Sequence, residues 1–250
     1  MPALNFKVYI PARYESTRLP GKLLLEVKGR TILEYVYRNA CASGAADVII
    51  ATDHREIEIA AKAFGAEVVM TKPQHVSGTD RIAEAASLCG EHDEQIIVNV
   101  QGDEPLLPPQ VIQQVAALLD ENSDASIATL CEEFAAGTDL ADPNVCKVVS
   151  TISQRAIYFS RAPIPFCREP GDRAMHRAAV RRHIGIYAYR VGFLQRFVEL
   201  PTSRLEQIEK LEQLRALENN FDIVVADACD DCGFGIDTQI DFDRFQAELH

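Results

Sequence analysis

Three basic side chains gather in residues 11–22, directly after an apolar run near the start of the chain. These are Arg13, Arg18 and Lys22. Arginine and lysine heads, together with backbone N–H groups of a tight loop, can bind a triphosphate. The segment lacks the GxxxxGK[ST] spacing of a Walker A loop. We favour a phosphate-binding role over a solvated basic turn, because the segment follows the first predicted strand.

Two acids that are far apart in the sequence could bind a divalent cation. Asp103 lies in residues 101–105, of sequence QGDEP, just after an apolar run. Mg²⁺ takes one or two carboxylates plus phosphate oxygens, so Asp103 is a candidate ligand, while Glu104 fits a helix-capping acid. Asp237 lies in residues 233–238, of sequence GFGIDT. It is either a second metal ligand or the N-cap of a following turn, and spacing alone does not decide.

Residues 77–81, of sequence SGTDR, open a predicted helix. Free N–H groups at a helix start can bind an anion, and Arg81 lies one turn further on. A plain capping box explains the same residues equally well. These residues alone therefore do not decide between ligand binding and helix capping.

Strand-like and helix-like patterns alternate through the first half of the chain. We expect strands at residues 6–10, 47–52, 67–70 and 95–100, and helices at 31–43, 55–64 (with Asp53 as N-cap), 79–89 and 108–120. This alternation predicts an α/β fold with a doubly wound, mostly parallel sheet. Ligands of such sheets bind at the carboxyl ends of strands. By this rule, the expected ligand-binding loops are residues 11–22, 53–55 and 101–107.

The pattern becomes less regular after about residue 125. We expect strands at residues 125–131, 145–151, 156–159, 185–189 and 222–226, helices at 205–217 and 241–249, and a polar surface loop at 167–182. We detect neither an internal repeat nor a low-complexity tract. The simplest prediction is a single α/β domain over residues 1–250, with an insert at about 130–190.

Composition limits the possible partners. The chain has 250 residues, and 25 basic against 37 acidic residues give a net charge of −12. An acidic protein does not attract nucleic acid non-specifically, so nucleic acid is not an expected partner. No run of about 18 apolar residues and no leader-like start occurs, so we expect no membrane partner and a cytoplasmic location. Seven irregularly spaced cysteines suit reduced thiols. Cys229 and Cys232 form one CxxC pair, for which we expect neither zinc nor redox chemistry.

Motifs along nearly the whole chain, from about Val8 to Phe245, resemble those of one family. The family is 3-deoxy-manno-octulosonate cytidylyltransferase, also called CMP-Kdo synthetase, and the matching motifs are PAR-x-x-STRLPGK, SGTDR, NVQGDEP, YFSRAPIP, RHIGIYAY, LEQLR and GIDT. Acylneuraminate cytidylyltransferases share the first motif, whereas NVQGDEP with YFSRAPIP and LEQLR is narrower and favours the octulosonate branch. The resemblance implies a nucleotide-diphospho-sugar transferase type of fold, with a small inserted dimerisation subdomain and a homodimer.

The resemblance also implies roles for individual residues. Arg13, Lys22, Asp103 and Asp237 match catalytic positions, and the two acids match Mg²⁺ ligands. Ser77 and Arg81 match positions near the cytosine and ribose, and the sugar-acid pocket matches Gln101, Arg161, His183, Tyr187, Glu212 and Gln213. From the residues alone, Arg161 fits either a carboxylate clamp or a surface salt bridge. A lone His183 is more often structural, and the charges near Glu212 could form a solvated helix face.

The implied reaction joins the CMP part of CTP to a 3-deoxy sugar acid, with Mg²⁺ as cofactor. The anomeric 2-hydroxyl of 3-deoxy-D-manno-octulosonate (Kdo) would attack the α-phosphorus and release pyrophosphate, for bacterial lipopolysaccharide synthesis. One alternative is another sugar acid, such as sialic acid or an 8-amino relative of Kdo. A second alternative is a non-catalytic nucleotide-sugar-binding protein of the same fold.

Overall fold

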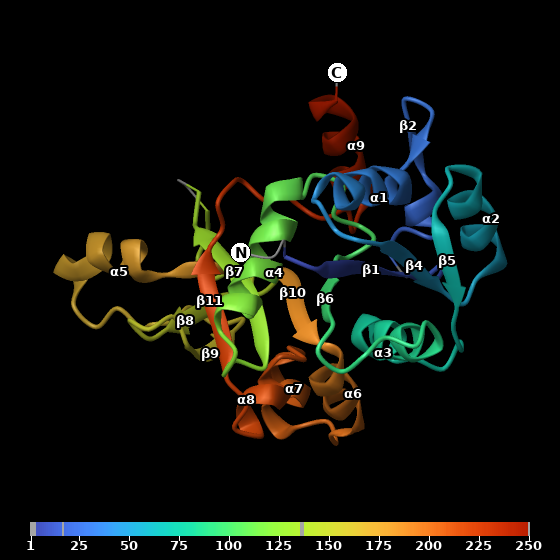
Figure 1. Cartoon of the computed structure of the whole chain (residues 1–250). Coiled ribbons are helices and arrows are strands. Elements are labelled where there is room, and N and C mark those ends of the chain that lie inside the picture. The colour runs from blue at the N-terminus through green and yellow to red at the C-terminus, as the bar shows by residue number, and fades with distance from the viewer. Residues whose placement is uncertain (1–3, 17, 136–137, 250) are drawn as a thin grey trace.

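A single mixed sheet forms the centre of the molecule (Figure 1). The computed structural model describes residues 4–16, 18–135 and 138–249. The main path of the sheet runs β11-β7-β10-β6-β1-β4-β5, and β8 pairs with both β10 and β9. These strands are β1 (Phe6–Ala12), β4 (Val48–Thr52), β5 (Glu67–Met70), β6 (Ile96–Asn99), β7 (Ile127–Glu133), β8 (Lys147–Ser150), β9 (Ala156–Ser160), β10 (Arg181–Arg190) and β11 (Ile223–Asp227).

Most neighbouring strands of the main path run parallel. β1 pairs in parallel with β4 and β6, β4 with β5, and β7 with β11. β10 is the exception: it lies antiparallel between β6 and β7. The predicted α/β fold with a mostly parallel sheet is confirmed. Because β1 and β6 are adjacent and parallel, the loops that follow them emerge side by side at one edge.

Helices cover both faces of the sheet (Figure 1). Alternate side chains of a strand point to opposite faces, so Val8 packs on one side and Tyr9 on the other. The first face carries α1 (Ile32–Ala42), α2 (Arg55–Ala63) and α4 (Pro109–Glu121), and the second carries α3 (Gly78–Leu88), α6 (Val191–Glu199) and α8 (Leu214–Glu218). This two-sided cover is the doubly wound arrangement.

A smaller hydrophobic cluster, separate from those on the two faces of the sheet, holds the C-terminal helix in place. Phe242 and Phe245 of α9 (Gln239–Glu248) pack against Ile32 at the start of α1. Val27 joins them from the hairpin of β2 (Glu26–Val27) and β3 (Arg30–Thr31). The packing brings residues near position 237 close to the loop after β1.

Local capping explains where several helices begin. The hydroxyl of Thr31 accepts a hydrogen bond from the Glu34 backbone N–H, and so caps α1. The expected N-cap of α2, Asp53, is wrong: His54 occupies that position. The Asp53 carboxylate instead lies 3.2 Å from the Arg81 guanidinium. A buried cation therefore removes this acid from the capping position.

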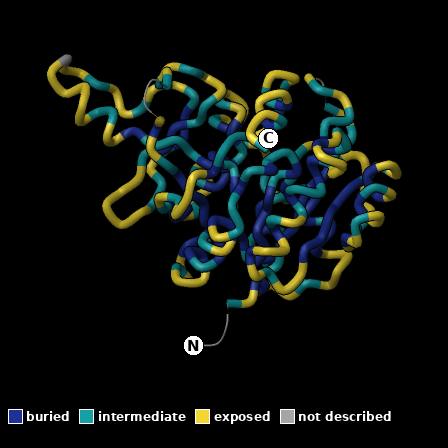
Figure 2. The backbone as a smooth tube through the Cα atoms, turned by 90° about the horizontal axis from the view of Figure 1, so that it is seen from above, coloured by how far each residue is buried: buried dark blue, intermediate teal, exposed yellow. Residues whose placement is uncertain are grey.

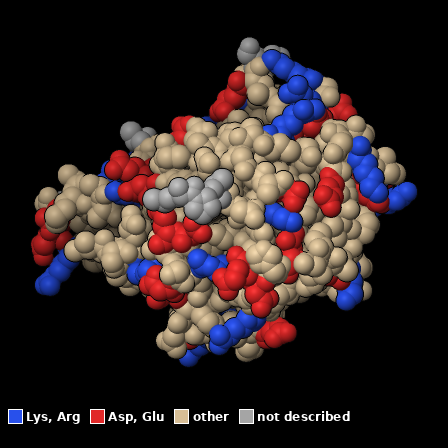
Figure 3. All heavy atoms as spheres, viewed as in Figure 1, with Lys and Arg blue, Asp and Glu red and all other residues tan. Residues whose placement is uncertain are grey.

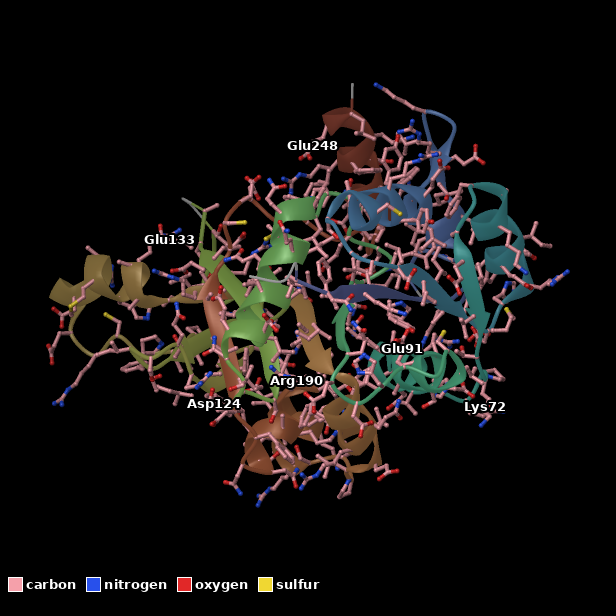
Figure 4. All side chains as sticks on the ribbon, in the orientation of Figure 1. Lys72, Glu91, Asp124, Glu133, Arg190 and Glu248 are labelled. Carbon is pink, nitrogen blue, oxygen red and sulfur yellow. The ribbon has the colours of Figure 1, made fainter. Side chains whose placement is uncertain are left out.

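Charged side chains also anchor the sheet at β1 and at the end of β10. The Lys7 ammonium and the Tyr9 hydroxyl each lie 2.8 Å from the same Glu91 carboxylate oxygen. Arg190 donates to the backbone oxygens of Leu119 (2.9 Å) and Ala125 (3.2 Å), at the end of α4; Glu91 and Arg190 are labelled in Figure 4. These bonds connect the end of α4 and the loop after it to β10. On the face in Figure 3, acidic and basic side chains are interspersed.

Residues between β7 and β10 extend the sheet with two strands beside β10 and then form an arm that projects to the side (Figure 1). They form β8, β9, a short 3-10 helix η2 (Pro170–Asp172) and α5 (Arg173–Ala179). The expected polar loop at 167–182 is wrong, because it contains η2, α5 and the first residues of β10. The run of Ala, Met and Arg in α5 has high helix propensity. Figure 2 shows that much of this arm is exposed. The single-domain organisation with an insert stays a prediction.

Other boundaries in the second half also differ from expectation. The continuous helix expected at 205–217 is wrong: it is divided into α7 (Arg204–Glu209) and α8. Lys210, which has a φ of 55°, ends α7. The expected strand at 185–189 is part of the longer β10, and α6 and the 3-10 helix η1 (Lys22–Leu24) were not predicted. Among the described residues, no helix is both long and apolar enough to cross a membrane.

Candidate active site

Three charged side chains from distant segments meet at the carboxyl edge of the sheet. The Lys22 Nζ lies 2.6 Å from Asp103 Oδ2 and 2.8 Å from Asp237 Oδ1. Arg18 Nη2 lies 2.9 Å from the second oxygen of Asp237. We call these four residues the charge cluster. Both predicted metal ligands thus converge on one position, which a cation already occupies.

Backbone contacts hold the loops of the charge cluster together. The Ile236 N–H donates to the Asp103 carbonyl oxygen over 2.8 Å, and so joins the two loops that carry the acids. Gly102 is necessary for the contact with the first loop, because a Cβ there would lie 3.2 Å from the Pro11 carbonyl oxygen. Gly21, with a φ of 65°, turns the chain before Lys22.

The alternative capping role of Asp237 is wrong. Thr238 is the N-cap of α9, and it forms a capping box with Asp241. The Asp237 carboxylate is left to bind Lys22 and Arg18.

Electrostatics keep Lys22 charged in this setting. Only 11% of its side chain is exposed, and this burial lowers its pKa. The attraction and hydrogen bonds of Asp103 and Asp237 outweigh burial, and the net result is a raised Lys22 pKa. The ammonium therefore stays positive and neutralises part of the charge of the two acids.

A cavity of about 320 Å³ opens beside the charge cluster. The residues that line it include three cations and several small or polar groups, among them Arg13, Ser16, Arg18, Lys22, Gly78 and Gln101. Arg13 Nη2 donates to the His75 carbonyl oxygen at 2.8 Å, and burial lowers the Arg13 pKa. Gly78 lies in the first turn of α3, so free N–H groups and cations face one space. That combination favours a polyanionic ligand.

Residues 77–81 cap α3 and reach the interior. Ser77 caps the helix and forms a capping box with Asp80, so the capping interpretation is confirmed. Arg81 is 1% exposed; its Nη1 donates to Thr71 over 2.6 Å, and its Nη2 lies 3.2 Å from Asp53. These contacts connect α3 to the ends of β4 and β5. The predicted nucleotide contacts of Ser77 and Arg81 stay predictions.

Glu212 lies against the start of α3. Its two carboxylate oxygens accept hydrogen bonds from Ser77 Oγ (3.4 Å) and Thr79 Oγ1 (3.2 Å). Burial is the main cause that raises the Glu212 pKa to about 7, although Arg215 opposes it. The interpretation of Glu212 as part of a solvated helix face is wrong, because the side chain faces α3. Its neighbour Gln213 is 5% exposed.

Aromatic and neutral polar groups line β10 near Glu212. His183 Nε2 lies 3.0 Å from the Thr129 hydroxyl, and its ring centroid lies 4.9 Å from Phe159 and 5.4 Å from Tyr187. Burial, with a smaller effect of Arg182, lowers the His183 pKa to about 3, so this imidazole is neutral. Burial likewise raises the Tyr187 pKa. We call His183, Tyr187, Glu212 and Gln213 the β10 pocket.

The remaining predicted ligands lie near these groups. Gln101 Nε2 donates to Asn99 Oδ1 over 3.2 Å and lines the cavity. The Arg161 guanidinium donates to backbone carbonyls of Pro143, Glu209 and Lys210. Within the described part of the chain it forms no salt bridge, and its role as a clamp for a substrate carboxylate stays a prediction.

Glu104 is a functional candidate that the sequence analysis placed elsewhere. The expected capping role is wrong, because Pro108 is the N-cap of α4. Glu104 instead borders a cavity of about 70 Å³ with Arg182 and His183. Burial, reinforced by the neighbouring Asp103, raises its pKa to about 7. Its position directly after Asp103 in a strand-end loop was the available signal.

The cysteines are free thiols. Cys229 is exposed, whereas Cys232 is buried, and burial raises the Cys232 pKa to about 12. A thiol with so high a pKa is a poor nucleophile at neutral pH. In the three described ranges, no group of three or more His, Cys, Asp or Glu side chains is arranged to hold a metal by itself. A cation at the charge cluster would need ligand atoms from the substrate as well.

Comparisons with known proteins agree with this geometry. Residues 8–223 match the family model described as Cytidylyltransferase. The chain is 50% identical to the 3-deoxy-manno-octulosonate cytidylyltransferase of Saccharophagus degradans, covering 98% of this chain and 99% of that protein, and 48% identical to that of Thioalkalivibrio sulfidiphilus, covering 98% and 99%. A solved CMP:2-keto-3-deoxy-manno-octonic acid synthetase, complexed with CTP, is 38% identical and superposes with a TM-score of 0.88, covering 98% of both chains. The chain therefore belongs to the cytidylyltransferase family, in the branch of the 3-deoxy-manno-octulosonate cytidylyltransferases.

Proposed function

We propose that this chain transfers CMP from CTP to Kdo and releases pyrophosphate, and that it thereby serves lipopolysaccharide synthesis. The observation that carries the proposal is the charge cluster: Asp103 and Asp237 share one cation beside a cavity lined by Arg13 and Arg18. The branch of the family supports the same reaction.

The donor set fits Mg²⁺ as the cofactor. Two carboxylates converge on a single point, and Mg²⁺ prefers one or two carboxylates with phosphate oxygens completing the shell. Asp103 and Asp237 would hold it. When bound, the ion supplies positive charge that polarises a phosphoryl oxygen or a nucleophilic hydroxyl. Lys22 contacts the same two acids, so its ammonium would have to move aside for an ion held between them.

The basic side chains would bind the triphosphate. Once released from the acids, the Lys22 ammonium can turn to a phosphate, next to Arg13 and Arg18 at the cavity. Fixed cations stabilise the charge that develops on departing pyrophosphate. The N-terminus of α3 adds N–H groups on the same side. Catalysis then depends on positioning and charge, without a covalent intermediate on the enzyme.

The β10 pocket would bind the sugar acid. Gln101 and Gln213 supply amides, Tyr187 a hydroxyl, and His183 a neutral imidazole. The Glu212 carboxyl, with a pKa of about 7, can donate as well as accept hydrogen bonds near neutral pH. Such neutral groups suit sugar hydroxyls. Kdo is our choice over sialic acid because the relatives that are 50% and 48% identical to this chain are named 3-deoxy-manno-octulosonate cytidylyltransferases.

Pyrophosphate release tests the proposed reaction. The purified chain is incubated with CTP, Mg²⁺ and, in separate reactions, Kdo, 8-amino-Kdo or sialic acid. We expect release with Kdo at a kcat/KM at least about tenfold above that of the other acids. CTP binding without release would favour the nucleotide-sugar-binding alternative. Preference for another acid would keep the chemistry but change the substrate.

We also propose a cytoplasmic homodimer that associates through the arm between β7 and β10. Its exposed large apolar side chains are Ile152, Ile157, Phe166 and Met175. Exposed apolar side chains in one region indicate an interaction surface. The free thiols suit a reducing compartment. Light scattering should give twice the chain mass, and Phe166→Ser should shift it towards the monomer.

A further inference from the structure

The link between α7 and α8 contains a strained residue. Lys210 has φ 55° and ψ 45°, in the left-handed region, where a residue with a Cβ is disfavoured. Such a conformation persists only when surrounding contacts determine it. Neither a glycine nor an asparagine occupies the position, so other groups must stabilise the break.

Arg161 supplies those contacts. Its Nε donates to the Glu209 carbonyl oxygen over 2.7 Å, and its Nη2 to the Lys210 carbonyl oxygen over 3.3 Å. These are carbonyls that the end of α7 leaves without a helical partner. In return, the Glu209 carboxylate accepts from the Arg161 backbone N–H (2.9 Å) and from Ser160 Oγ (2.6 Å). We call this reciprocal arrangement the Arg161–Glu209 lock.

The lock is attached to a rigid base. The Arg161 carbonyl oxygen accepts a 2.6 Å hydrogen bond from the Lys147 ammonium, and Lys147 is fully buried. That ammonium also donates to the carbonyl oxygens of Asp142 and Val145, each over 2.7 Å. Arg161 Nη1 binds Pro143 O over 2.8 Å in the same loop. Arg161 therefore has little freedom to move.

The break decides which way Glu212 faces. In an unbroken helix, residues three apart share a face, so Glu212 would lie on the same side as Glu209, towards β9. In the structure, Glu209 contacts Ser160 of β9, whereas Glu212 contacts Ser77 and Thr79 at the start of α3. The left-handed residue between them separates the two directions.

We propose that Arg161 is a positioning residue: it stabilises the break at Lys210 and thereby orients Glu212 and Gln213 in the β10 pocket. Its guanidinium acts through the carbonyl oxygens of Glu209 and Lys210, between α7 and α8. The part of this inference that concerns catalysis rests on the proposed function.

A rescue experiment separates positioning from direct binding. The lysine ammonium is a compact point of charge without the spread Nε, Nη1 and Nη2 donors of the guanidinium, so Arg161→Lys cannot keep all three carbonyl contacts and weakens the lock. Glycine adopts the left-handed conformation without strain, so Lys210→Gly removes the need for the lock. Lys210→Ala is the matched control, because it removes the lysine side chain but keeps the Cβ. The measurements are KM for Kdo, KM for CTP and Tm.

We expect Arg161→Lys to raise KM for Kdo about tenfold and to lower Tm by about 3 °C, while KM for CTP changes less than about twofold. Adding Lys210→Gly should recover most of both losses, and adding Lys210→Ala should recover neither. If Lys210→Gly restores Tm but not KM, Arg161 contacts the substrate directly, and the proposal is overturned. An unchanged KM and Tm in Arg161→Lys also overturns it.

Two features keep the outcome readable. If no transferase activity is found, the proposed function fails, but the Tm values of the parent and the three variants still test the lock. If Arg161→Lys does not fold, Glu209→Gln weakens the same lock from the other side. We expect Glu209→Gln to raise KM for Kdo in the same direction, with recovery by Lys210→Gly and none by Lys210→Ala. Absence of that recovery contradicts the lock.

Discussion

The charge cluster and the β10 pocket adjoin the same sheet but differ in the charge of their side chains. The cluster joins full charges: Lys22 between Asp103 and Asp237, with Arg18 outside them. The side chains of the β10 pocket are half-buried or buried and close to neutral, since desolvation makes His183 unprotonated and keeps the Glu212 proton to about pH 7. The difference suits two tasks, because phosphates need compensating charge, whereas sugar hydroxyls need directional neutral partners.

We expect the largest loss of activity from a substitution in the charge cluster. Asp103→Asn removes one of two carboxylates that converge on the cation. We expect kcat to fall by at least about 10³-fold, because metal-ligand and oxyanion-type charge effects are of that size. Circular dichroism and Tm should change little. Asp172→Asn, in the exposed arm, is the matched control and should keep normal turnover. A near-normal rate for Asp103→Asn would exclude its metal role.

A second substitution tests whether Lys22 occupies the place of the metal. Lys22→Met leaves the two carboxylates without their shared ammonium. We expect kcat/KM to fall by about 10²-fold, because a cation at the leaving phosphates is lost. In contrast, Mn²⁺ binding without nucleotide, followed by electron paramagnetic resonance, should become about tenfold tighter. Weaker or unchanged Mn²⁺ binding would show that Lys22 does not compete with the ion.

The buried pocket should respond to pH. The folded state holds the Glu212 proton to about pH 7, whereas an unfolded glutamate releases it near pH 4.5. The folded state therefore binds more protons in this window, and the contribution of Glu212 to stability falls as pH rises from 4.5 to 7. Glu212→Gln stays neutral and should be more stable than the parent at pH 8, on the order of 2 kcal/mol.

Unfolding of Glu212→Gln is followed by urea titration at pH 5 and pH 8. The advantage of the variant should shrink towards pH 5, where both chains carry a neutral side chain. Equal differences at the two pH values would contradict a raised Glu212 pKa. KM for Kdo should rise in the same variant, and this would separate the stability of the pocket from its proposed use.

We expect the smallest effect from a substitution that tests whether the cap of α9 positions Asp237 in the charge cluster. Thr238→Ala removes the capping hydroxyl of α9, directly after Asp237. Loss of such a cap costs about 1 kcal/mol, so Tm should fall by about 2–4 °C. Since Asp237 keeps its contacts to Lys22 and Arg18, kcat should change less than about threefold. A loss as large as that of Asp103→Asn would mean that the cap positions Asp237.

The two regions also differ in how well their sequence predicts them. For the charge cluster, short loops after β1 and β6 carry Arg13, Lys22 and Asp103, and the strand-end rule brings such loops together. For Asp237, spacing alone did not decide between a metal ligand and an N-cap. The metal-ligand role came from the family resemblance and stays a prediction, whereas the structure excludes the capping role because Thr238 is the N-cap of α9.

The β10 pocket depends on features without a local signal. The antiparallel direction of β10 follows from the whole sheet, and the break at Lys210 follows from contacts with Arg161, distant in the sequence. A pattern of helix-forming residues across 205–217 therefore predicted one helix. Glu212 and Gln213 entered only through the resemblance, and no pattern in the sequence indicates that Arg161 binds carbonyl oxygens.

The reversed direction of β10 has a consequence for how the chain is routed. Glu133, at the end of β7 and labelled in Figure 4, pairs with Arg181, at the start of β10. The chain thus departs from the sheet and returns to it at neighbouring points on one rim, the rim where the cations gather. A detour between such points can lengthen, shorten or change shape without shifting the register between β7 and β10. The surroundings of the reaction can therefore diverge among relatives while the scaffold stays the same.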